Sequence, residues 1–274
     1  MMRMVMVVFC LLLMAPMGAQ AGESKDWQAV QGDIVMLHHA AATTVTVFGQ
    51  QWPLQRQADG SVRAWVGVDL ARKPGRYPVH WQQGSGTGTQ FLQVTAGHFR
   101  VSRITVKRSM AVFNSEQLGR IRYDQRLLRV SYKQPVARHA NFSFPAMPIS
   151  GIISTPFGAK RFVNGAPRSP HSGVDIAAAA GTPIHVPVAG RVVLVASMYL
   201  NGNTVVVAHG DGLVEIFSHL SNVDVFRGDR LRAGQLIGLV GATGRATGPH
   251  LHWGLRFAGA RVTPLSLLPA ALSP

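Results

Sequence analysis

The stretch Pro249–Phe257, Pro-His-Leu-His-Trp-Gly-Leu-Arg-Phe, alternates apolar and polar residues with the two-residue period of a β-strand. The apolar face, which can enter a core, carries Leu251, Trp253, Leu255 and Phe257. The opposite face presents His250 and His252, and two imidazoles at this spacing can reach one metal ion. By itself the motif is equally consistent with a half-buried strand that carries two histidines.

A second segment, Pro170–Asp175, supplies further candidate ligands. His171 and Asp175 are four residues apart, and the proline and glycine around them favour extended chain. A neutral imidazole and a carboxylate are both good zinc ligands. Together with one histidine of the His-Leu-His strand, they would form a three-ligand set with an open fourth position, which is typical of a catalytic zinc site.

The residue pattern does not choose between His250 and His252 as the third ligand. The other one, together with His219 near the end of a strand expected over residues 213–220, could serve as general base and as stabiliser of an oxyanion. The sequence has no His-Glu-x-x-His segment, so the glutamate base of that motif is absent and a histidine base is the consistent alternative.

The N-terminus has the pattern of a secretory signal peptide. Arg3 precedes the apolar run Val5–Met14, and Ala19-Gln20-Ala21 is a small-x-small cleavage site. We expect cleavage after Ala21, no stable membrane insertion afterwards, and a location in the periplasm or cell envelope; a retained anchor is the alternative. Cys10 is the only cysteine and precedes the cut, so the mature chain would bind a metal through His, Asp or Glu.

The net charge of the chain indicates which classes of partner it can bind. The 274 residues have a formal net charge of +15, which favours a polyanion such as nucleic acid, an anionic membrane surface or a cell-wall polymer. Export makes nucleic acid a poor partner. The hydrophobic content of 47% indicates a folded chain, and 29 Gly with 16 Pro favour β structure with frequent turns.

Three parts are expected after the signal peptide (1–21). Residues 22–97 are predicted to form a small immunoglobulin-like β-sandwich, with Asp59-Gly60 as a hairpin turn between two of its strands and 84–88 as a flexible loop. Residues 98–148 are predicted to be a connector with a strand over 98–107 and a helix over 115–131, capped by Asn114. The inner side of this helix is expected to carry Leu118, Ile121, Gln125 and Leu128.

The remainder of the helix carries Arg120, Arg122, Arg126 and Arg129. A solvated face is the simplest interpretation of these arginines, and attraction to an anionic polymer is the functional one.

Residues 149–274 are predicted to be an all-β domain, because no segment there is long and periodic enough for a major helix. A lipoyl- or biotinyl-carrier module is excluded, since it needs a lysine at a hairpin tip and residues 161–274 contain none.

Three segments together, Pro170–Asp175, Phe217–Leu220 and Gly248–Trp253, resemble the signature segments of the lysostaphin- and LytM-type zinc endopeptidases, which cut peptidoglycan cross-links. The resemblance implies one Zn²⁺ per chain, bound by His171, Asp175 and His252. It also implies that His219 and His250 are the catalytic histidines. Phe217 stands where such proteins commonly have tyrosine, and Ala179 where proline is common; no ligand or catalytic position is substituted.

We therefore expect a secreted zinc endopeptidase that acts on peptidoglycan stem peptides, at a DD cross-link if the compartment is a Gram-negative periplasm. The N-terminal β domain resembles the accessory domain of some periplasmic members. The alternative is a non-catalytic member of the same fold that binds cell wall or activates an amidase. If the N-terminal domain occludes the zinc cleft, a chain that starts near Pro148 would be more active than the mature chain.

Overall fold

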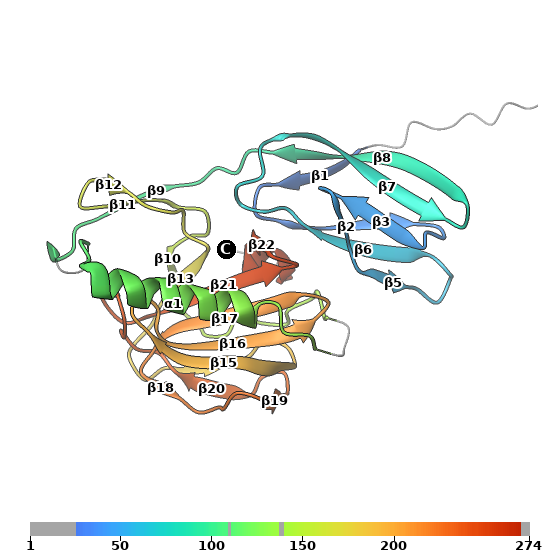
Figure 1. Ribbon diagram of the computed structural model, residues 1–274. Helices are drawn as coiled ribbons and strands as arrows, with labels where there is room; N and C mark the ends of the chain where they lie inside the picture. Colours follow the sequence, from blue (N-terminus) through green and yellow to red (C-terminus); the bar gives the residue numbers. More distant parts are fainter. Residues whose placement is uncertain (1–25, 109–110, 137–139, 270–274) are drawn as a thin grey trace, which may run out of the picture.

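The computed structural model describes residues 26–108, 111–136 and 140–269, so the predicted signal peptide lies outside the described residues. Figure 1 shows a chain built mainly of strands, in two units; the connector that follows the first unit carries helix α1 (Ser115–Ser131), which lies across the main sheet of the second. The mainly-β class predicted from the sequence is confirmed. The predicted domain bounds at 97 and 148 stay predictions.

The N-terminal unit is a sandwich of two sheets. The larger sheet has the strand order β1 (Trp27–Val30), β8 (Gly86–Thr95), β7 (Gly75–Gln83), β3 (Thr44–Val47) and β4 (Gln50–Gln51). The smaller sheet has the order β2 (Ile34–His39), β6 (Val62–Gly67) and β5 (Leu54–Arg56). Alternate residues of both sheets are fully buried between the layers, among them Leu37, Val45, Val62, Ala64, Val79 and Leu92.

Of two turn predictions in this unit, one is confirmed and one was wrong. Asp59-Gly60 lies in a hairpin turn, as predicted, and this turn joins β5 to β6, although β5 itself was not predicted from the sequence. Residues 86–88, predicted as part of a flexible loop, begin β8, and Gly86 pairs with Gln83 in a hairpin. The side chains at this hairpin tip are exposed and pack against no core, so glycines are tolerated in the strand there.

The connector contributes a strand and the helix. Strand β9 (Val101–Ile104) is shorter than predicted and pairs in parallel with β11 (Lys160–Val163), so it completes a sheet of the C-terminal unit. Helix α1 (Ser115–Ser131) has the predicted bounds and cap. The Asn114 side chain accepts a hydrogen bond from Gln117 N, and the Gln117 side chain accepts one from Asn114 N, which is a capping box.

The inner side of α1 differs from the prediction. Ile121 and Asp124 are buried, whereas Leu118 is 40% exposed and Gln125 is exposed. Leu128 and Tyr132 pack on a small apolar cluster of the underlying sheet, made by Val193, Val206, Ala208, Val214 and Ile216. In the described part of the chain, no helix has both the length and the apolar character needed to cross a membrane.

The C-terminal unit is all-β, as predicted, apart from the 3-10 helix η2 (Pro264–Leu267). Its main sheet has the order β10 (Ile152–Thr155), β13 (Gly173–Ala177), β21 (His250–Phe257), β17 (Leu213–Leu220), β16 (Gly202–Gly210), β15 (Gly190–Met198) and β19 (Arg230–Leu231), with β22 (Ala260–Val262) beside β21. A smaller sheet has the order β14 (Pro183–His185), β20 (Leu236–Leu239) and β18 (Asn222–Val223), and β12 (Ala166–Pro167) extends the β11–β9 pair.

The two units pack against each other through one hydrophobic core. The ring centroids of Trp52 and Phe257 lie 5.2 Å apart, and Trp65 stacks on Phe142 at 4.7 Å. At the edge of this contact, Arg261 of β22 donates hydrogen bonds to both carboxylate oxygens of Asp69, the shorter at 2.7 Å. The sandwich is therefore anchored to the end of β21 that lies away from the histidines.

Candidate metal centre

Strands β13 and β21 bring two polar side chains face to face. The strands are antiparallel, with Asp175 directly opposite His252. The alternation predicted for β21 is confirmed, since its core face is fully buried at Leu251, Trp253, Leu255 and Phe257. His250 and His252 lie on the other face, with side chains 15% and 12% exposed.

Gly173 lets these two strands approach closely. A Cβ at this position would lie 2.5 Å from the Trp253 carbonyl oxygen and 2.8 Å from Cε1 of His252. Since real Cβ atoms do not come so near to backbone, any side chain here would push β13 away from β21. The glycine between His171 and Asp175 is therefore part of what holds the carboxylate against His252.

Three of the predicted site residues converge on one point. His171 Nε2 lies 2.9 Å from Asp175 Oδ1 and 2.9 Å from His252 Nδ1. His252 Nδ1 lies 2.8 Å from Asp175 Oδ1. One ligand atom from each residue lies within 4.8 Å of the others, so the three residues could hold a metal ion. His171, Asp175 and His252 are called the metal triad below.

Backbone and arginine contacts orient the triad. His171 Nδ1 donates a hydrogen bond to the Pro156 carbonyl at 3.0 Å, which leaves the lone pair of Nε2 facing the other two residues. Arg161 Nη2 donates to Asp175 Oδ2 at 3.0 Å and leaves Oδ1 for the cluster. Two ring nitrogens and one carboxylate oxygen around a single point match the donor set of a metal ion. The residues present therefore fit a metal.

The protonation states also suit metal binding. Burial lowers the pKa of His171 to about 4, although the neighbouring Asp175 carboxylate acts to raise it. Burial acts to raise the pKa of the Asp175 carboxyl, but its close contacts with the imidazoles of His171 and His252 hold that pKa well below its usual range. At neutral pH the first imidazole is neutral and the carboxylate is ionised, which are the forms that ligate metals.

His219 reaches the metal triad through a β-bulge. Strand β17 has two residues, Ser218 and His219, opposite the single Thr204 of β16, and His219 has φ +69°. Simple alternation would place His219 on the core face with Phe217, which is fully buried. The extra residue turns its ring to the other face, where its centroid lies 4.6 Å from that of His250 and 6.2 Å from that of His252.

His219 and His250 are held in the same tautomer. His219 Nδ1 donates to the Thr243 carbonyl at 2.8 Å, and His250 Nδ1 donates to the Gly248 carbonyl at 2.9 Å. Each neutral ring therefore has a free lone pair on Nε2. Burial, with repulsion from His252, lowers the pKa of His219 to about 4, so this ring is neutral and can accept a proton. His250 Nε2 lies 4.0 Å from Asp175 Oδ1, so all five predicted residues are close together.

Other conspicuous residues lie outside this cluster. His209 is fully buried, donates through Nδ1 to the Ala189 carbonyl and has Nε2 2.9 Å from Glu215 Oε2, while Glu215 Oε1 accepts from the Trp253 indole. These contacts, all within the core, give His209 a structural role. The phenyl ring of Phe217 is likewise in the core, because Phe217 lies opposite the buried Trp253 of β21.

Sequence reasoning missed two contributors to the site. Arg161 contacts Asp175 only because β11 is placed beside the metal triad by a long-range fold, and one arginine among many carries no local signal. Thr243 acts through its backbone carbonyl, which any residue supplies. The glycine-rich composition of 241–248 was the one local sign that backbone groups there approach other residues closely.

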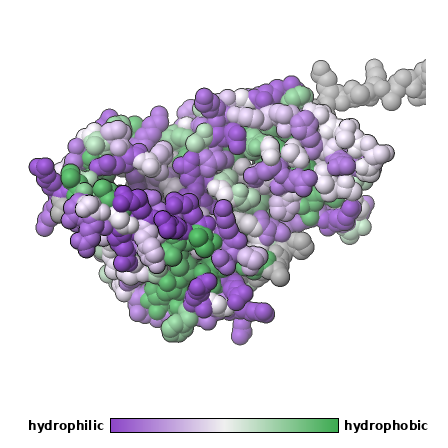
Figure 2. All heavy atoms as spheres, viewed as in Figure 1, coloured by the Kyte–Doolittle hydropathy of each residue, from purple (hydrophilic) through white to green (hydrophobic). Residues whose placement is uncertain are grey.

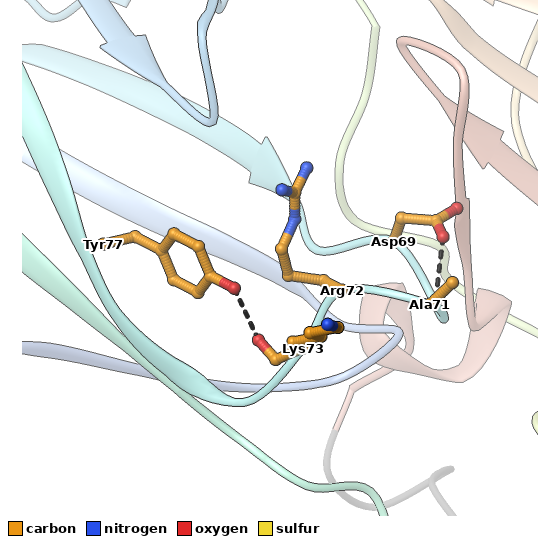
Figure 3. Close-up of a pocket in the computed structure, with 5 residues that line it drawn as sticks. All are labelled: Asp69, Ala71, Arg72, Lys73 and Tyr77. Carbon is orange, nitrogen blue, oxygen red and sulfur yellow. Dashed lines mark hydrogen bonds between the residues drawn. The ribbon is translucent and has the colours of Figure 1, made fainter.

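The pocket in Figure 3 lies in the N-terminal unit and includes none of the metal triad. It has a volume of about 360 Å³ and is lined by Asp69, Ala71, Arg72, Lys73 and Tyr77. Two of its polar side chains are already engaged: the Tyr77 hydroxyl donates to the Lys73 carbonyl at 2.6 Å, and Asp69 accepts from Ala71 N and pairs with Arg261. We assign it no chemistry.

The C-terminal unit is similar in sequence to known proteins. Residues 169–264, which include all five site residues, match the model of Peptidase family M23. The chain is 37% identical over 115 residues to the DD-carboxypeptidase/endopeptidase Mpg of Neisseria meningitidis serogroup B, which is 42% of this chain and 26% of that protein. It is 41% identical over 97 residues to the peptidoglycan DD-endopeptidase ShyA of Vibrio cholerae, 35% of this chain and 23% of that protein. The matches thus span about a quarter of these curated relatives.

One solved structure is similar over most of the chain. It comes from Pseudomonas aeruginosa, is assigned to peptidase M23, and is 31% identical, with a TM-score of 0.70. The similarity covers 87% of this chain and 94% of that one, so it extends beyond the C-terminal unit. Identity at this level over nearly all of that protein, together with the family match across the metal triad, shows that this chain belongs to peptidase family M23.

Proposed function

We propose that this protein is a zinc-dependent endopeptidase that hydrolyses peptide cross-links of bacterial peptidoglycan. The observation that carries the proposal is the convergence of His171, Asp175 and His252 beside a second histidine pair, His219 and His250. A site built only for structural metal binding would not need two further histidines with free Nε2 atoms at its edge.

The metal triad is assigned one zinc ion per chain. Three protein ligands leave a coordination position for water or substrate, which is typical of catalytic rather than structural zinc sites. Zinc, when bound, supplies Lewis-acid polarisation of the scissile carbonyl and lowers the pKa of a coordinated water to about 7. Arg161 and the Pro156 carbonyl hold Asp175 and His171 in the orientation that ligation requires.

His219 and His250 are proposed to have different catalytic roles. His219 is neutral at physiological pH because burial lowers its pKa, so its Nε2 can accept the proton of the attacking water and later return it to the leaving amine nitrogen. His250 would donate from Nε2 to the oxyanion in its imidazolium form, which takes its second proton from solvent. The backbone acceptors at Thr243 and Gly248 fix both rings for these roles.

The proposed substrate is the stem peptide of peptidoglycan, at a DD bond. The names of two relatives specify DD-endopeptidase or DD-carboxypeptidase/endopeptidase activity. The +15 formal charge suits a polymer rich in carboxylates. Figure 2 shows hydrophilic residues along α1, and its outer side carries the exposed Arg120, Arg122, Arg126 and Arg129. Export to the periplasm or cell envelope is proposed on the sequence pattern alone, and it makes nucleic acid an unsuitable partner.

The deciding experiment is digestion of purified peptidoglycan by the mature protein, with and without chelator, followed by separation of the muropeptides. Conversion of cross-linked dimers to monomers, abolished by chelator and restored by Zn²⁺, is the expected result. No conversion by a protein that contains stoichiometric zinc would contradict the proposal unless activity appears when the N-terminal unit is loosened. Absence of both zinc and conversion would favour the non-catalytic regulator instead.

Occlusion of the metal centre by the N-terminal unit stays a prediction. The aromatic and Asp69–Arg261 contacts between the units lie near Phe257, at the far end of β21. Since a strand rises about 3.3 Å per residue, Phe257 is roughly 16 Å along β21 from His252. A nearer contact, that of Phe157 with Gly32, supports the turn whose Pro156 carbonyl orients His171.

A further inference from the structure

The loop between β20 and β21 contacts both of the histidines that lie outside the metal triad. The Thr243 carbonyl accepts the hydrogen bond from Nδ1 of the His219 ring at 2.8 Å. Two residues earlier in the chain, the Gly241 carbonyl accepts one from the backbone N–H of His250 at 3.1 Å. The position of this loop therefore affects where both histidines stand beside the metal triad.

The Thr243 hydroxyl fastens this loop to two neighbouring strands. It accepts a hydrogen bond from the backbone N–H of Asn203 on β16 at 3.0 Å, and it donates one to the Leu220 carbonyl on β17 at 2.8 Å. Asn203 and Leu220 are paired across these strands, beside the bulge that carries His219. One side-chain oxygen, which acts as donor and as acceptor, thus joins the loop to the strand pair at the bulge.

Two glycines let the backbone pack closely around this hydroxyl. A Cβ at Gly202 would lie 2.3 Å from Thr243 Oγ1, and a Cβ at Gly244 would lie 2.3 Å from the backbone nitrogen of Gly202. In the turn that contains Gly202, the Asn201 carbonyl accepts a hydrogen bond from the backbone N–H of His219 at 2.9 Å. The backbone and the ring of His219 are therefore held by two loops that meet at Thr243.

The hydroxyl matters for the reaction because the His219 ring must keep one tautomer. If the Thr243 carbonyl moves out of reach, the proton of the neutral ring can move from Nδ1 to Nε2. Nε2 then has no lone pair for the proton of the attacking water, and the ring cannot act as the base. Any residue at this position supplies the carbonyl, but only threonine or serine supplies a hydroxyl that bonds both strands.

We propose that Thr243 is a positioning residue for the peptidase reaction and acts through His219. Its hydroxyl holds the loop in place, so that its carbonyl keeps the His219 ring in the tautomer with a free lone pair on Nε2. The proposal rests on the proposed peptidase function and goes beyond it, because it gives a role to a side chain that is neither a proposed ligand nor a proposed catalytic histidine.

The test uses substitutions that separate the hydroxyl from the shape of the side chain. Thr243→Val keeps the shape and removes the hydroxyl, whereas Thr243→Ser keeps the hydroxyl. Thr182→Val is the matched control, because Thr182 is also half-buried and its hydroxyl also donates to a backbone carbonyl, that of Ala179, at 2.7 Å. Nitrogen NMR of the mature chain near neutral pH gives the tautomer of the His219 ring, with His219→Ala identifying its resonances. Zinc content, kcat and KM are measured on the same samples with a cross-linked muropeptide.

We expect Thr243→Val to keep stoichiometric zinc and the KM of the unsubstituted chain, but to populate both tautomers of the His219 ring and to lose about 10- to 100-fold in kcat. Thr243→Ser, the conservative variant, should retain the tautomer and most of the kcat, and Thr182→Val should change neither. Combined with His219→Ala, Thr243→Val should cause no further loss of kcat, because its effect acts through that ring.

Three results would overturn the positioning role. One is a His219 ring that carries its proton on Nε2 in the unsubstituted chain, or an unchanged tautomer in Thr243→Val. Another is a loss of kcat as large in the His219→Ala background as without it, which would indicate a general structural defect. The third is failure of Thr243→Val to fold while Thr243→Ser folds, which would assign the hydroxyl to stability. Absence of hydrolysis by the unsubstituted chain would count against the peptidase function instead, and the tautomer measurement would still decide on Thr243.

Discussion

At the scale of single residues, the backbone conformation of His219 indicates a role different from that of the proposed zinc ligands His171, Asp175 and His252. Its positive φ is rare for a residue with a side chain and is tolerated here because the Thr243 carbonyl and the bulge opposite Thr204 fix the ring. Strain of this kind at a histidine beside a metal triad indicates that ring position, rather than stability, is what the local structure preserves.

Two matched substitutions test whether His219 differs from a zinc ligand. His171→Ala removes a proposed ligand and should abolish both zinc binding and hydrolysis. His219→Ala removes a proton acceptor outside the metal triad, so it should retain stoichiometric zinc while kcat falls about 10²- to 10⁴-fold. Metal content by mass spectrometry and kcat on a cross-linked muropeptide distinguish the two. Loss of zinc in His219→Ala would show that this residue is a ligand or a scaffold instead.

The buried histidines also predict how the stability of the metal-free protein depends on pH. The pKa of His171 and of His219 is about 4 in the fold against about 6.5 in the unfolded chain, so the unfolded state binds more protons between these values. The free energy of unfolding should therefore be constant above pH 6.5 and fall by a few kcal/mol as the pH drops towards 4. Urea denaturation of the chelated protein at pH 7.5 and pH 4.5 measures this. A smaller fall in His219→Gln is expected, and equal stability at both pH values would refute the pKa argument.

At the scale of elements, the sequence predicts features that follow from periodic residue patterns and cap signals. It does not predict features that depend on contacts with distant segments. The alternation of β21 gave its two faces correctly, and the Asn114 and Gln117 cap signals gave the bounds of α1. The bulge at His219 adds one residue to an otherwise regular strand and has no residue-type signature. The parallel pairing of β9 with β11 joins segments about sixty residues apart, a contact that local propensity does not specify.

The inner side of α1 illustrates the same limit. An apolar helical stripe predicted Leu118 and Gln125 as inward positions, but the buried polar position is Asp124. Its carboxylate accepts a hydrogen bond from Tyr199 N at 2.7 Å and one from Arg120 Nε at 3.0 Å. A carboxylate that satisfies a backbone N–H on another element occupies an inward position that hydrophobicity alone does not predict.

This contact ties α1 to the hairpin beside the site, and it gives a testable prediction. Asp124→Ala leaves the Tyr199 N–H without its acceptor and should lower the free energy of unfolding by about 2–3 kcal/mol. Glu116→Ala, which removes an exposed acidic residue from the first turn of the same helix, should change it by less than about 1 kcal/mol. Urea denaturation with tryptophan fluorescence measures both. Equal effects of the two substitutions would mean that the buried carboxylate does not anchor the helix.

At the scale of the whole molecule, the two units and the connector depend on one another. Helix α1 covers the apolar cluster that includes Val206 and Val214, and β9 occupies the edge of β11. On the side of the N-terminal unit, the Phe157 ring lies against Gly32, next to the carbonyl that orients His171. The segments that precede Pro148 therefore support the peptidase sheet as well as linking it to the sandwich.

This dependence changes what truncation can reveal about occlusion. A chain that starts near Pro148 would lose α1, β9 and the Phe157–Gly32 contact, and each apolar side chain uncovered costs about 1 kcal/mol or more. We expect it to melt at least about 10 °C lower than the mature chain and to be no more active, whether or not the sandwich covers the cleft. Arg261→Ala in the mature chain is the sharper experiment, because it breaks the pair with Asp69 and keeps both connector elements. Faster muropeptide cleavage by Arg261→Ala at unchanged zinc content would support occlusion, whereas a truncated chain that is both stable and more active would refute the supporting role of the connector.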